Sequence, residues 1–277
     1  MNVLKRIFGK FKSKWFMFGN FYQPIIPFRV NILYWRKSQH SENVGDLFSV
    51  IVLSFMKEFY NINKTFTFKT IRLASIGSLI QSLNTKTTVW GSGIISPSSF
   101  SNFNRNVELD IRSVRGPKTR ELLLEKGFYC PENFGDPALL FPDFYTPSIF
   151  VTKYDYLVIP HHLKINQYLH LGDDIMLSTI TSDWRTFIDK IYNSQLVISA
   201  SLHGIIIAEA YGIPAILLND IQYDMFKYQD YYCSTGRFDF LLANSIEEAL
   251  AMEKPAVPDM SLLKRQLYES FPVDLWK

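Results

Sequence analysis

The stretch Leu196-Val197-Ile198-Ser199-Ala200-Ser201-Leu202-His203-Gly204, continued by Ile205-Ile206-Ile207-Ala208-Glu209-Ala210-Tyr211, decides the fold class. Residues 196–200 form a short, mainly apolar run, which is typical of a strand buried on both faces. Residues 203–211 are apolar nearly all round and predict a buried helix, which Gly212 ends. A strand joined to a buried helix by two residues indicates one β-α unit of a parallel sheet.

The same alternation extends in both directions along the chain. Upstream, short apolar runs predict strands over 32–35, 71–76, 88–90 and 107–114, with helices over 47–60 and from Pro117 to Gly127. Downstream, strands are expected over 156–160, 175–180 and 215–218, with helices after Ser182-Asp183 and over 245–252 and 261–271. The fold class predicted is therefore α/β, with mainly parallel sheets covered on both faces.

A proline-rich segment divides the chain into two halves. Pro137, Pro142 and Pro147 interrupt residues 135–147, which predicts a linker. The chain has 277 residues and is 47% hydrophobic, enough for two cores of about 100–130 residues each. The expected parts are an N-terminal segment (1–28), an N-terminal domain (29–146) and a C-terminal domain (147–277).

The N-terminal segment is basic, while the rest of the chain is mildly acidic. No acidic residue precedes Glu42, but eight basic residues do. On a helical wheel of residues 3–18, one face is apolar and the other carries Lys5, Arg6 and Lys12. The apolar face consists of Leu4, Ile7, Phe8, Phe11, Trp15 and Phe18. Such a helix either lies on an anionic membrane surface or packs against this protein or a second copy of it.

Composition also limits the class of protein. A net charge of +3 is too small to indicate a nucleic-acid-binding protein. Cys130 and Cys233 belong to no metal-binding or disulfide pattern, as expected for reduced thiols in a cytoplasmic protein. No apolar run approaches the ~20 residues that span a bilayer, and no secretory signal is recognisable.

Polar residues follow several predicted strands, at the edge where open α/β sheets bind ligands. In the first half they are Asn43, Gly45 and Asp46, then Gly91, Ser92 and Gly93, then Arg115. In the second half they are His161 and His162, then Ser199, Ser201, Leu202, His203 and Gly204. Because these residues follow separate strands but share one kind of location, they predict a single binding site.

Several of these residues also have a structural interpretation. Asp46 is suited to capping its helix, and the Gly91–Gly93 triplet is far shorter than a dinucleotide-binding fingerprint. Arg115 is either a surface charge or, beside a helix that starts Gly-Pro, part of an anion site. His161 and His162 do not predict a metal site, because neighbouring strand residues point apart and no carboxylate lies at ligand spacing.

His203 is the most informative of them. At the first turn of a buried helix, its cationic form is disfavoured unless an anion such as phosphate or carboxylate balances it. The alternative is a structural histidine with satisfied hydrogen bonds. Glu209, inside the same apolar helix, is expected to form structural hydrogen bonds rather than to act in catalysis.

An ordered set of motifs resembles the polysaccharide pyruvyl transferase family, most closely the ketal pyruvyltransferases of succinoglycan-type exopolysaccharide synthesis. The motifs are Tyr34-Trp35-Arg36, Asn43-Val44-Gly45-Asp46, Trp90-Gly91-Ser92-Gly93, Ser113-Val114-Arg115-Gly116-Pro117, Gly135-Asp136-Pro137-Ala138 and the segment from Leu196 to Pro214. The resemblance implies a GT-B-like architecture, with two Rossmann-like domains facing a central cleft and the last helix packing back on the first domain. It also implies phosphoenolpyruvate as donor, a sugar as acceptor, a pyruvate ketal as product and no further cofactor.

The resemblance assigns donor binding to Leu202 and His203 and places the acceptor on the N-terminal domain. Many family members have arginine where this chain has Ser201, so we expect Arg115 to supply the second positive charge. Within this reading His203 is the acid or the phosphate ligand, Asp46 or Asp136 is the base, and His161 or His162 is a reserve acid.

Two other functions compete with this one. A nucleotide-sugar glycosyltransferase of GT-B architecture would need a ribose-binding carboxylate, and Glu209 is the candidate that the second half offers. A non-catalytic assembly factor at the membrane would use the basic segment and a degenerate cleft. For the pyruvyltransferase, the expected acceptor is a lipid-linked oligosaccharide. The expected location is the cytoplasm, peripheral on the inner face of a bacterial plasma membrane.

Overall fold

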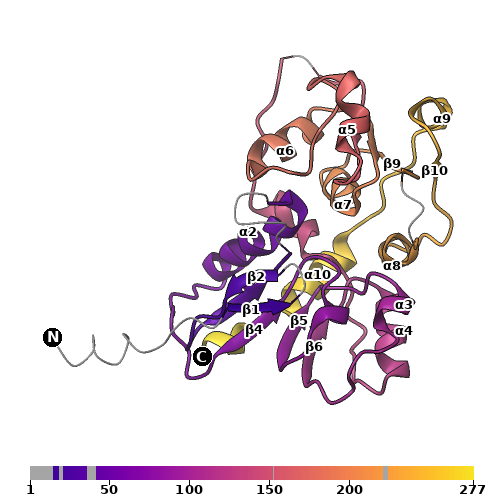
Figure 1. Cartoon of the computed structure of the whole chain (residues 1–277). Coiled ribbons are helices and arrows are strands. Elements are labelled where there is room, and N and C mark those ends of the chain that lie inside the picture. The colour runs from indigo at the N-terminus through magenta and orange to yellow at the C-terminus, as the bar shows by residue number, and fades with distance from the viewer. Residues whose placement is uncertain (1–14, 19–20, 36–41, 152, 221–223) are drawn as a thin grey trace.

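The computed structural model describes residues 15–18, 21–35, 42–151, 153–220 and 224–277, and within them two four-stranded parallel sheets form the framework. The first sheet has the order β3-β4-β5-β6, and the second has the order β10-β9-β8-β7 (Figure 1). The bounds of the first sheet are Val30–Leu33 (β3), Ile71–Ala74 (β4), Thr87–Trp90 (β5) and Leu109–Ser113 (β6). Those of the second are Leu157–Ile159 (β7), Val197–Ser199 (β8), Ala215–Leu218 (β9) and Leu242–Ala243 (β10). The α/β class is confirmed, and both sheets are compatible with Rossmann-like halves.

The helices of the first half begin where the sequence provides caps. The helix α2 (Val44–Phe59) is capped by Asn43, whose side chain accepts a hydrogen bond from the backbone N–H of Gly45. The helix α4 (Pro117–Glu125) starts with proline, and Gly127 follows it with φ of 85°. The short elements are η1 (Ile80–Ser82) and α3 (Pro97–Phe100).

The second half contains the buried helix predicted by the central stretch. The helix α7 (Leu202–Ala210) is buried along most of its length, and α6 (Trp184–Tyr192) is capped by Asp183. The remaining elements are α5 (Ile165–Tyr168), η3 (Leu169–Leu171), α8 (Phe226–Ser234), α9 (Ile246–Ala251), α10 (Ser261–Glu269) and η4 (Val273–Trp276). Within the described ranges, no helix combines the length and the apolar character needed to cross a membrane.

The segment predicted to be a linker is part of the core. Residues Pro137–Asp143 form the 3-10 helix η2, in which Pro137 to Phe141 are fully or almost fully buried. It packs against α7 and α2, and the largest hydrophobic cluster includes side chains from both halves. Proline suits a short 3-10 helix because it fixes φ, so these prolines mark a buried crossing rather than an exposed connection.

The last helix lies against the first half of the chain. The indole Nε1 of Trp90 donates to the carbonyl of Leu267 at 3.0 Å, and the hydroxyl of Tyr60 donates to the carbonyl of Tyr268 at 2.8 Å. Figure 1 shows α10 crossing from the second half towards β5. The boundaries proposed at residues 28 and 146 stay predictions.

Two predicted elements are wrong. Residues 175–180 form no strand: Met176 bridges to Val158 of β7 and Ile180 bridges to Asn43, the N-cap of α2, so this segment runs from the second sheet to the start of α2 with isolated bridges only. Residues Trp15–Phe18, expected at the end of a helix over 3–18, are instead strand β1 and pair with β2 (Phe21–Pro24). Aromatic residues favour strands, and a two-residue connection suits a hairpin. Residues 1–14 of that predicted helix lie outside the described residues.

Candidate functional site

A pocket of about 350 Å³ lies where the carboxyl ends of the two sheets meet. From the first half it is lined by Trp35, Asn43, Asp46, Gly77, Ser78, Leu79, Gln81, Ser82, Ile95 and Arg115. From the second half it is lined by His161, His162, Thr179, Ser201, Leu202, His203 and Lys227. Parallel strands place their following loops at one edge, so residues far apart in sequence meet here.

His203 lies in this pocket with a buried carboxylate behind it. Its Nε2 is 3.7 Å from Oδ2 of Asp136, and neither atom has a hydrogen-bond partner among the described residues. Asp136 is fully buried, and its other oxygen accepts a hydrogen bond from the backbone N–H of Ala138 at 3.0 Å. This arrangement places a buried carboxylate directly behind the imidazole, on the side away from the pocket.

Gly45 makes room for the imidazole. A Cβ atom at position 45 would lie 2.1 Å from Nδ1 of His203, a distance that no real contact allows. Gly45 is buried and is not itself part of the pocket wall. Its contribution is therefore to let α2 from the first half pack directly against His203 from the second.

The N-terminus of α7 opens into the pocket. Ser201 occupies the N-cap position but forms no side-chain capping bond. Among the described residues, the backbone N–H groups of Leu202 and His203 have no hydrogen-bond acceptor. Unsatisfied N–H groups at the positive end of a helix dipole are a ready site for an anion.

Asp46 and Lys227 form an oppositely charged pair of groups on this pocket. Burial raises the pKa of Asp46 to about 6, although the nearby positive charges of His203 and Lys227 oppose the shift. Burial also lowers the pKa of Lys227 to about 8, with the charge of Arg115 acting in the same direction and Asp46 against it. Near neutral pH the carboxylate is mainly ionised and the lysine is mainly cationic.

Lys227 is the functional candidate that the sequence analysis missed. It lies on α8, a helix that was not predicted, after the carboxyl end of strand β9. A single lysine has no distinguishing pattern, but the rule that located the other residues applies equally to the segment after residues 215–218.

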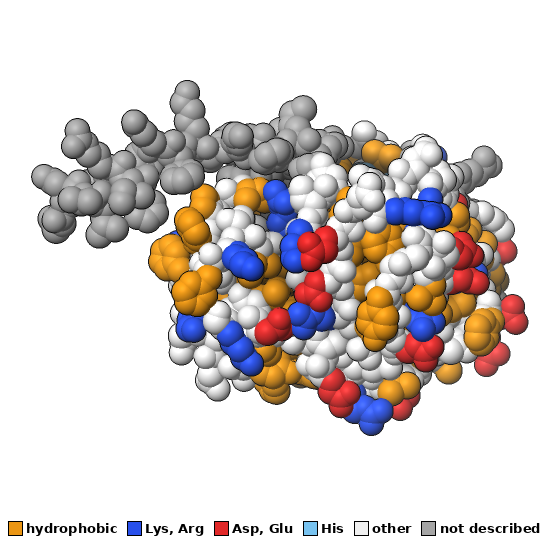
Figure 2. All heavy atoms as spheres, turned by 90° about the horizontal axis from the view of Figure 1, so that it is seen from below, with side chains coloured by type: hydrophobic (Ala, Val, Ile, Leu, Met, Phe, Trp, Pro, Cys, Tyr) orange, Lys and Arg blue, Asp and Glu red, His pale blue; other side chains and the backbone are white. Residues whose placement is uncertain are grey.

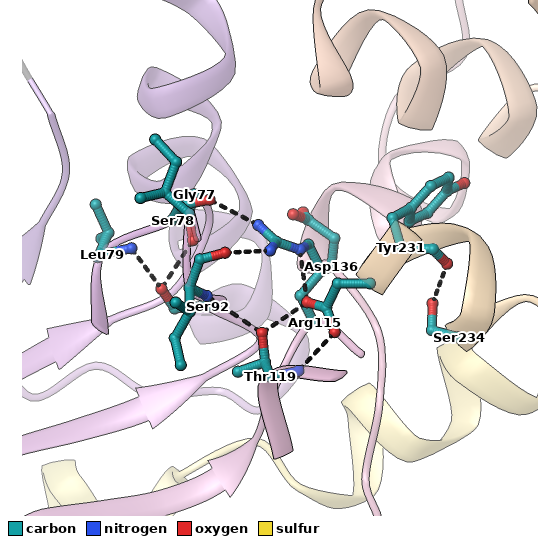
Figure 3. A network of polar contacts seen from close by, with 12 residues as sticks. Gly77, Ser78, Leu79, Ser92, Arg115, Thr119, Asp136, Tyr231 and Ser234 are labelled. Atoms are coloured by element: carbon teal, nitrogen blue, oxygen red, sulfur yellow. Dashed lines mark hydrogen bonds and ion pairs between the residues drawn. The ribbon is translucent and has the colours of Figure 1, made fainter. Parts of the chain in front are cut away.

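Arg115 lines the pocket but is held by the protein itself. Its Nε donates to Oδ2 of Asp230 at 3.0 Å, Nη1 donates to Oγ of Ser78 at 2.8 Å, and Nη2 donates to the carbonyl of Ile94 at 2.7 Å (Figure 3). The side chain is 1% exposed, and Asp230 is fully buried. The guanidinium is therefore fixed in place, and its charge is balanced by Asp230.

The histidine pair lines the same pocket. The rings of His161 and His162 lie 4.2 Å apart, and His162 is 5.6 Å from Trp35. Burial lowers the pKa of His161 to about 3, and the charges of His162 and Lys227 add to this effect. At neutral pH this imidazole is therefore mainly neutral, and the role of reserve acid stays a prediction for His161 and His162.

Five other predicted site residues lie outside the pocket wall. Ser92 donates to the carbonyl of Gly77 and accepts from the N–H of Leu79, and Ser199 is bonded to the backbone of Ser201. The three glycines give space to neighbours: Gly91 to Pro137, Gly93 to the guanidinium of Arg115, and Gly204 to Ser199. These residues shape the walls of the site and do not reach its interior.

Glu209 has the structural role expected for it. It accepts two hydrogen bonds from Arg237, both at 2.7 Å, and one from the hydroxyl of Tyr231 at 2.6 Å. It is 3% exposed and does not line the pocket, so it is not placed to bind a ribose. In the described part of the chain, no group of three or more His, Cys, Asp or Glu side chains is positioned to hold a metal ion.

Comparison with known proteins gives one match. A family model described as polysaccharide pyruvyl transferase matches residues 18–220, about three quarters of the chain. Neither the curated proteins nor the solved structures give a match.

Proposed function

The chain belongs to the polysaccharide pyruvyl transferase family, and we propose that it transfers the pyruvyl group of phosphoenolpyruvate to a sugar of a bacterial surface polysaccharide, forming a pyruvate ketal. The observation that carries this proposal is the pocket itself. It brings His203 and an open helix N-terminus into the same cavity as Asp46, a carboxylate with a pKa near 6. Such a cavity can hold a doubly anionic donor and also activate a hydroxyl group.

We place the donor beside the second sheet. The free N–H groups of Leu202 and His203 and the side chain of His203 suit an anionic group. The two sheets support a GT-B-like arrangement, in which residues 147–277 form the donor domain and residues 29–146 the acceptor domain.

The acceptor sugar then lies against the first half of the chain. Trp35 presents an aromatic ring to the pocket, which suits the apolar face of a sugar. Ser78, Gln81 and Ser82 line the same wall and provide polar groups for its hydroxyls. Asn43 and Asp46 lie at the start of α2, between this wall and His203.

The reaction balances with these groups. His203 gives a proton to the methylene carbon of phosphoenolpyruvate, and the adjacent carbon that carries oxygen becomes cationic. A sugar hydroxyl attacks that carbon while Asp46 takes the proton of the hydroxyl. Phosphate leaves, and the neighbouring hydroxyl closes the ketal and gives its proton to the departing phosphate. Asp136 acts behind His203, because it is fully buried and does not face the pocket.

The test measures phosphate release and the mass gain of an acceptor oligosaccharide. Replacing His203 by Ala is expected to lower kcat/KM roughly 100-fold or more, the scale for removing one preorganised catalytic group. The control is His170→Ala, since His170 is exposed and lies in η3, outside the pocket wall. Full activity of the His203 variant would refute the proposal. Stabilisation of the protein by nucleotide sugars but not by phosphoenolpyruvate would favour a glycosyltransferase instead.

If the acceptor is lipid-linked, the protein has to bind at the membrane surface. One surface patch of the described residues supports such binding. Phe28, Phe66 and Phe68 are 50%, 63% and 89% exposed, and the basic residues beside them in the chain are Arg29, Lys64 and Lys69. The two loops are joined by a hydrogen bond from the N–H of Thr67 to the carbonyl of Phe28 at 2.8 Å. Figure 2 shows exposed hydrophobic and basic side chains next to each other on the face seen from below. Aromatic rings with basic neighbours are suited to an anionic bilayer surface, as is the basic N-terminal segment.

The membrane proposal is tested with vesicles. The full chain is expected to bind phosphatidylserine vesicles more strongly than phosphatidylcholine vesicles. Removing residues 1–19, or replacing Phe66 and Phe68 by Ser, should weaken that binding, whereas replacing the exposed Phe238 by Ser should not. Equal binding of all variants would exclude this peripheral location.

A further inference from the structure

We infer that Lys227 of α8 holds the phosphate group of phosphoenolpyruvate, and that Arg115 is a positioning residue that fixes α8. This inference rests on the proposed function and names a donor contact within it. Lys227 lies beyond residues 18–220, the part of the chain that the family model matches.

The first observation is that the guanidinium of Arg115 is already bonded to protein acceptors. All three nitrogens of its guanidinium donate to protein acceptors, one of which is the buried carboxylate of Asp230. A ligand phosphate would have to compete with a carboxylate that is 0% exposed and cannot turn to solvent. Nη1 and Nη2 each keep one further N–H, but the charge of the guanidinium is already balanced by Asp230, so a net positive charge for a ligand has to come from another residue.

The second observation is that the ammonium group of Lys227 has no carboxylate paired with it among the described residues. It lines the pocket, and among the described residues no carboxylate lies within 4 Å of its Nζ. Its ammonium lies 4.7 Å from the ring centre of Tyr228, a contact that holds the side chain without neutralising its charge. Asp46 is the carboxylate whose charge acts on it across the pocket.

The third observation is that α8 is held rigidly where it delivers this lysine. Residues 227 and 230 are three apart on the helix and therefore lie on neighbouring positions of one face. Asp230 accepts hydrogen bonds from the N–H and the hydroxyl of Thr119 as well as from Arg115. The backbone of Asp230 also packs so closely on Gly116 that a Cβ there would lie 2.0 Å from its carbonyl oxygen.

The chemistry of the two cations supports the assignment to phosphate. A lysine ammonium is a compact charge that approaches a tetrahedral phosphate from any direction, whereas the planar arginine fork needs two free donors in fixed positions. Together with the open N-terminus of α7, Lys227 encloses one anion between two cationic elements.

The experiment compares Lys227→Met, Lys227→Arg and the control Lys118→Met in the full chain. Lys118 carries the same charge but lines a different pocket, between α4 and α8. We measure KM for phosphoenolpyruvate and, by calorimetry without turnover, the affinity for inorganic phosphate. In K227M both should weaken at least 10-fold, K227R should recover most of the loss, and K118M should match the wild type. Unchanged phosphate affinity in K227M would overturn the inference.

Arg115 is tested by Arg115→Lys. Because a lysine ammonium cannot reproduce the three nitrogen donors that reach Asp230, Ser78 and Ile94, this change should lower the free energy of unfolding in urea. In the folded fraction, phosphate affinity should fall less than in K227M, and the reverse order would overturn the inference. A wild-type chain that binds phosphate but does not turn over phosphoenolpyruvate would contradict the proposed function, while phosphate affinity would still decide the role of the lysine.

Discussion

At the residue scale, Asp46 is a group whose catalytic use conflicts with stability. Burial raises its pKa from 3.8 to about 6, so the folded chain binds a proton there more tightly than the unfolded chain does. Stability therefore falls as the pH rises from about 4 to 6, and the deficit persists above that range. A base with a pKa near the working pH is, however, suited to proton transfer.

Replacing Asp46 by Asn should separate these two effects. At pH 8 the variant is expected to be more stable by roughly 1–2 kcal/mol, after allowance for the partial exposure of the carboxylate. Its kcat should fall about 100-fold. Urea unfolding at pH 5 and pH 8 measures the first effect, and phosphate release measures the second. Asp174→Asn, on the exposed surface, is the control. A destabilised but active Asp46 variant would show that the carboxylate is structural.

The pKa of Asp46, about 6, and that of Lys227, about 8, together predict a bell-shaped pH dependence of kcat/KM. Activity should fall below pH 6 as Asp46 takes up a proton, and above pH 8 as Lys227 loses one. In Lys227→Arg the alkaline limb should move beyond pH 9, because arginine keeps its charge. An alkaline limb that stays near pH 8 in that variant would assign the limb to another group.

The rule that ligands bind beyond the carboxyl ends of parallel strands predicted which residues would lie close together. His203, Asp46, Arg115 and His161 follow predicted strands, and the structure places all four on one pocket. The sequence did not reveal that Arg115 is paired with Asp230, because the two are 115 positions apart and only packing brings them together. It also did not reveal that Gly91 and Gly93 give space to neighbouring side chains rather than to a ligand.

At the element scale, the pair formed by Arg115 and Asp230 fastens α8 to the start of α4. Replacing Asp230 by Asn leaves a buried guanidinium without its counter-charge, so the free energy of unfolding should fall by about 3–5 kcal/mol. The comparison is Asp274→Asn, which removes a more exposed ion pair with Arg112 and should change stability by less than about 1 kcal/mol. Equal losses in urea would mean that the buried pair does not hold the helix.

Prediction of elements depended on how clearly each one is bounded. The helices α2, α4 and α6 have caps or a first-turn proline, and the sequence located them to within a few residues. The helix α8 has no side-chain cap, and it buries Phe226 and Asp230 on the side opposite Tyr228, Tyr231 and Tyr232, so its burial does not follow a single apolar face. The run 175–180 is partly buried between β7 and the start of α2, which a pattern of hydrophobicity does not distinguish from a strand.

At the scale of the whole molecule, the two halves share one core and are expected to unfold together. The largest hydrophobic cluster draws on both sheets, and α10 is bonded to Trp90 of the first. Urea unfolding followed by tryptophan fluorescence and by far-ultraviolet circular dichroism should therefore give coincident single transitions. Two separated transitions would show that residues 29–146 and 147–277 are independent folding units.

The close approach of Gly45 to His203 limits which residues can occur at position 45 during evolution. Because α2 leaves no space beside the imidazole, position 45 cannot gain a side chain without displacing His203. Among natural relatives, a side chain at the position of Gly45 should occur only where the histidine has been lost. Gly45 belongs to the first half of the chain and His203 to the second. A recombination that replaces one half by that of another protein would therefore keep the packing only if the new half has glycine at the position of Gly45.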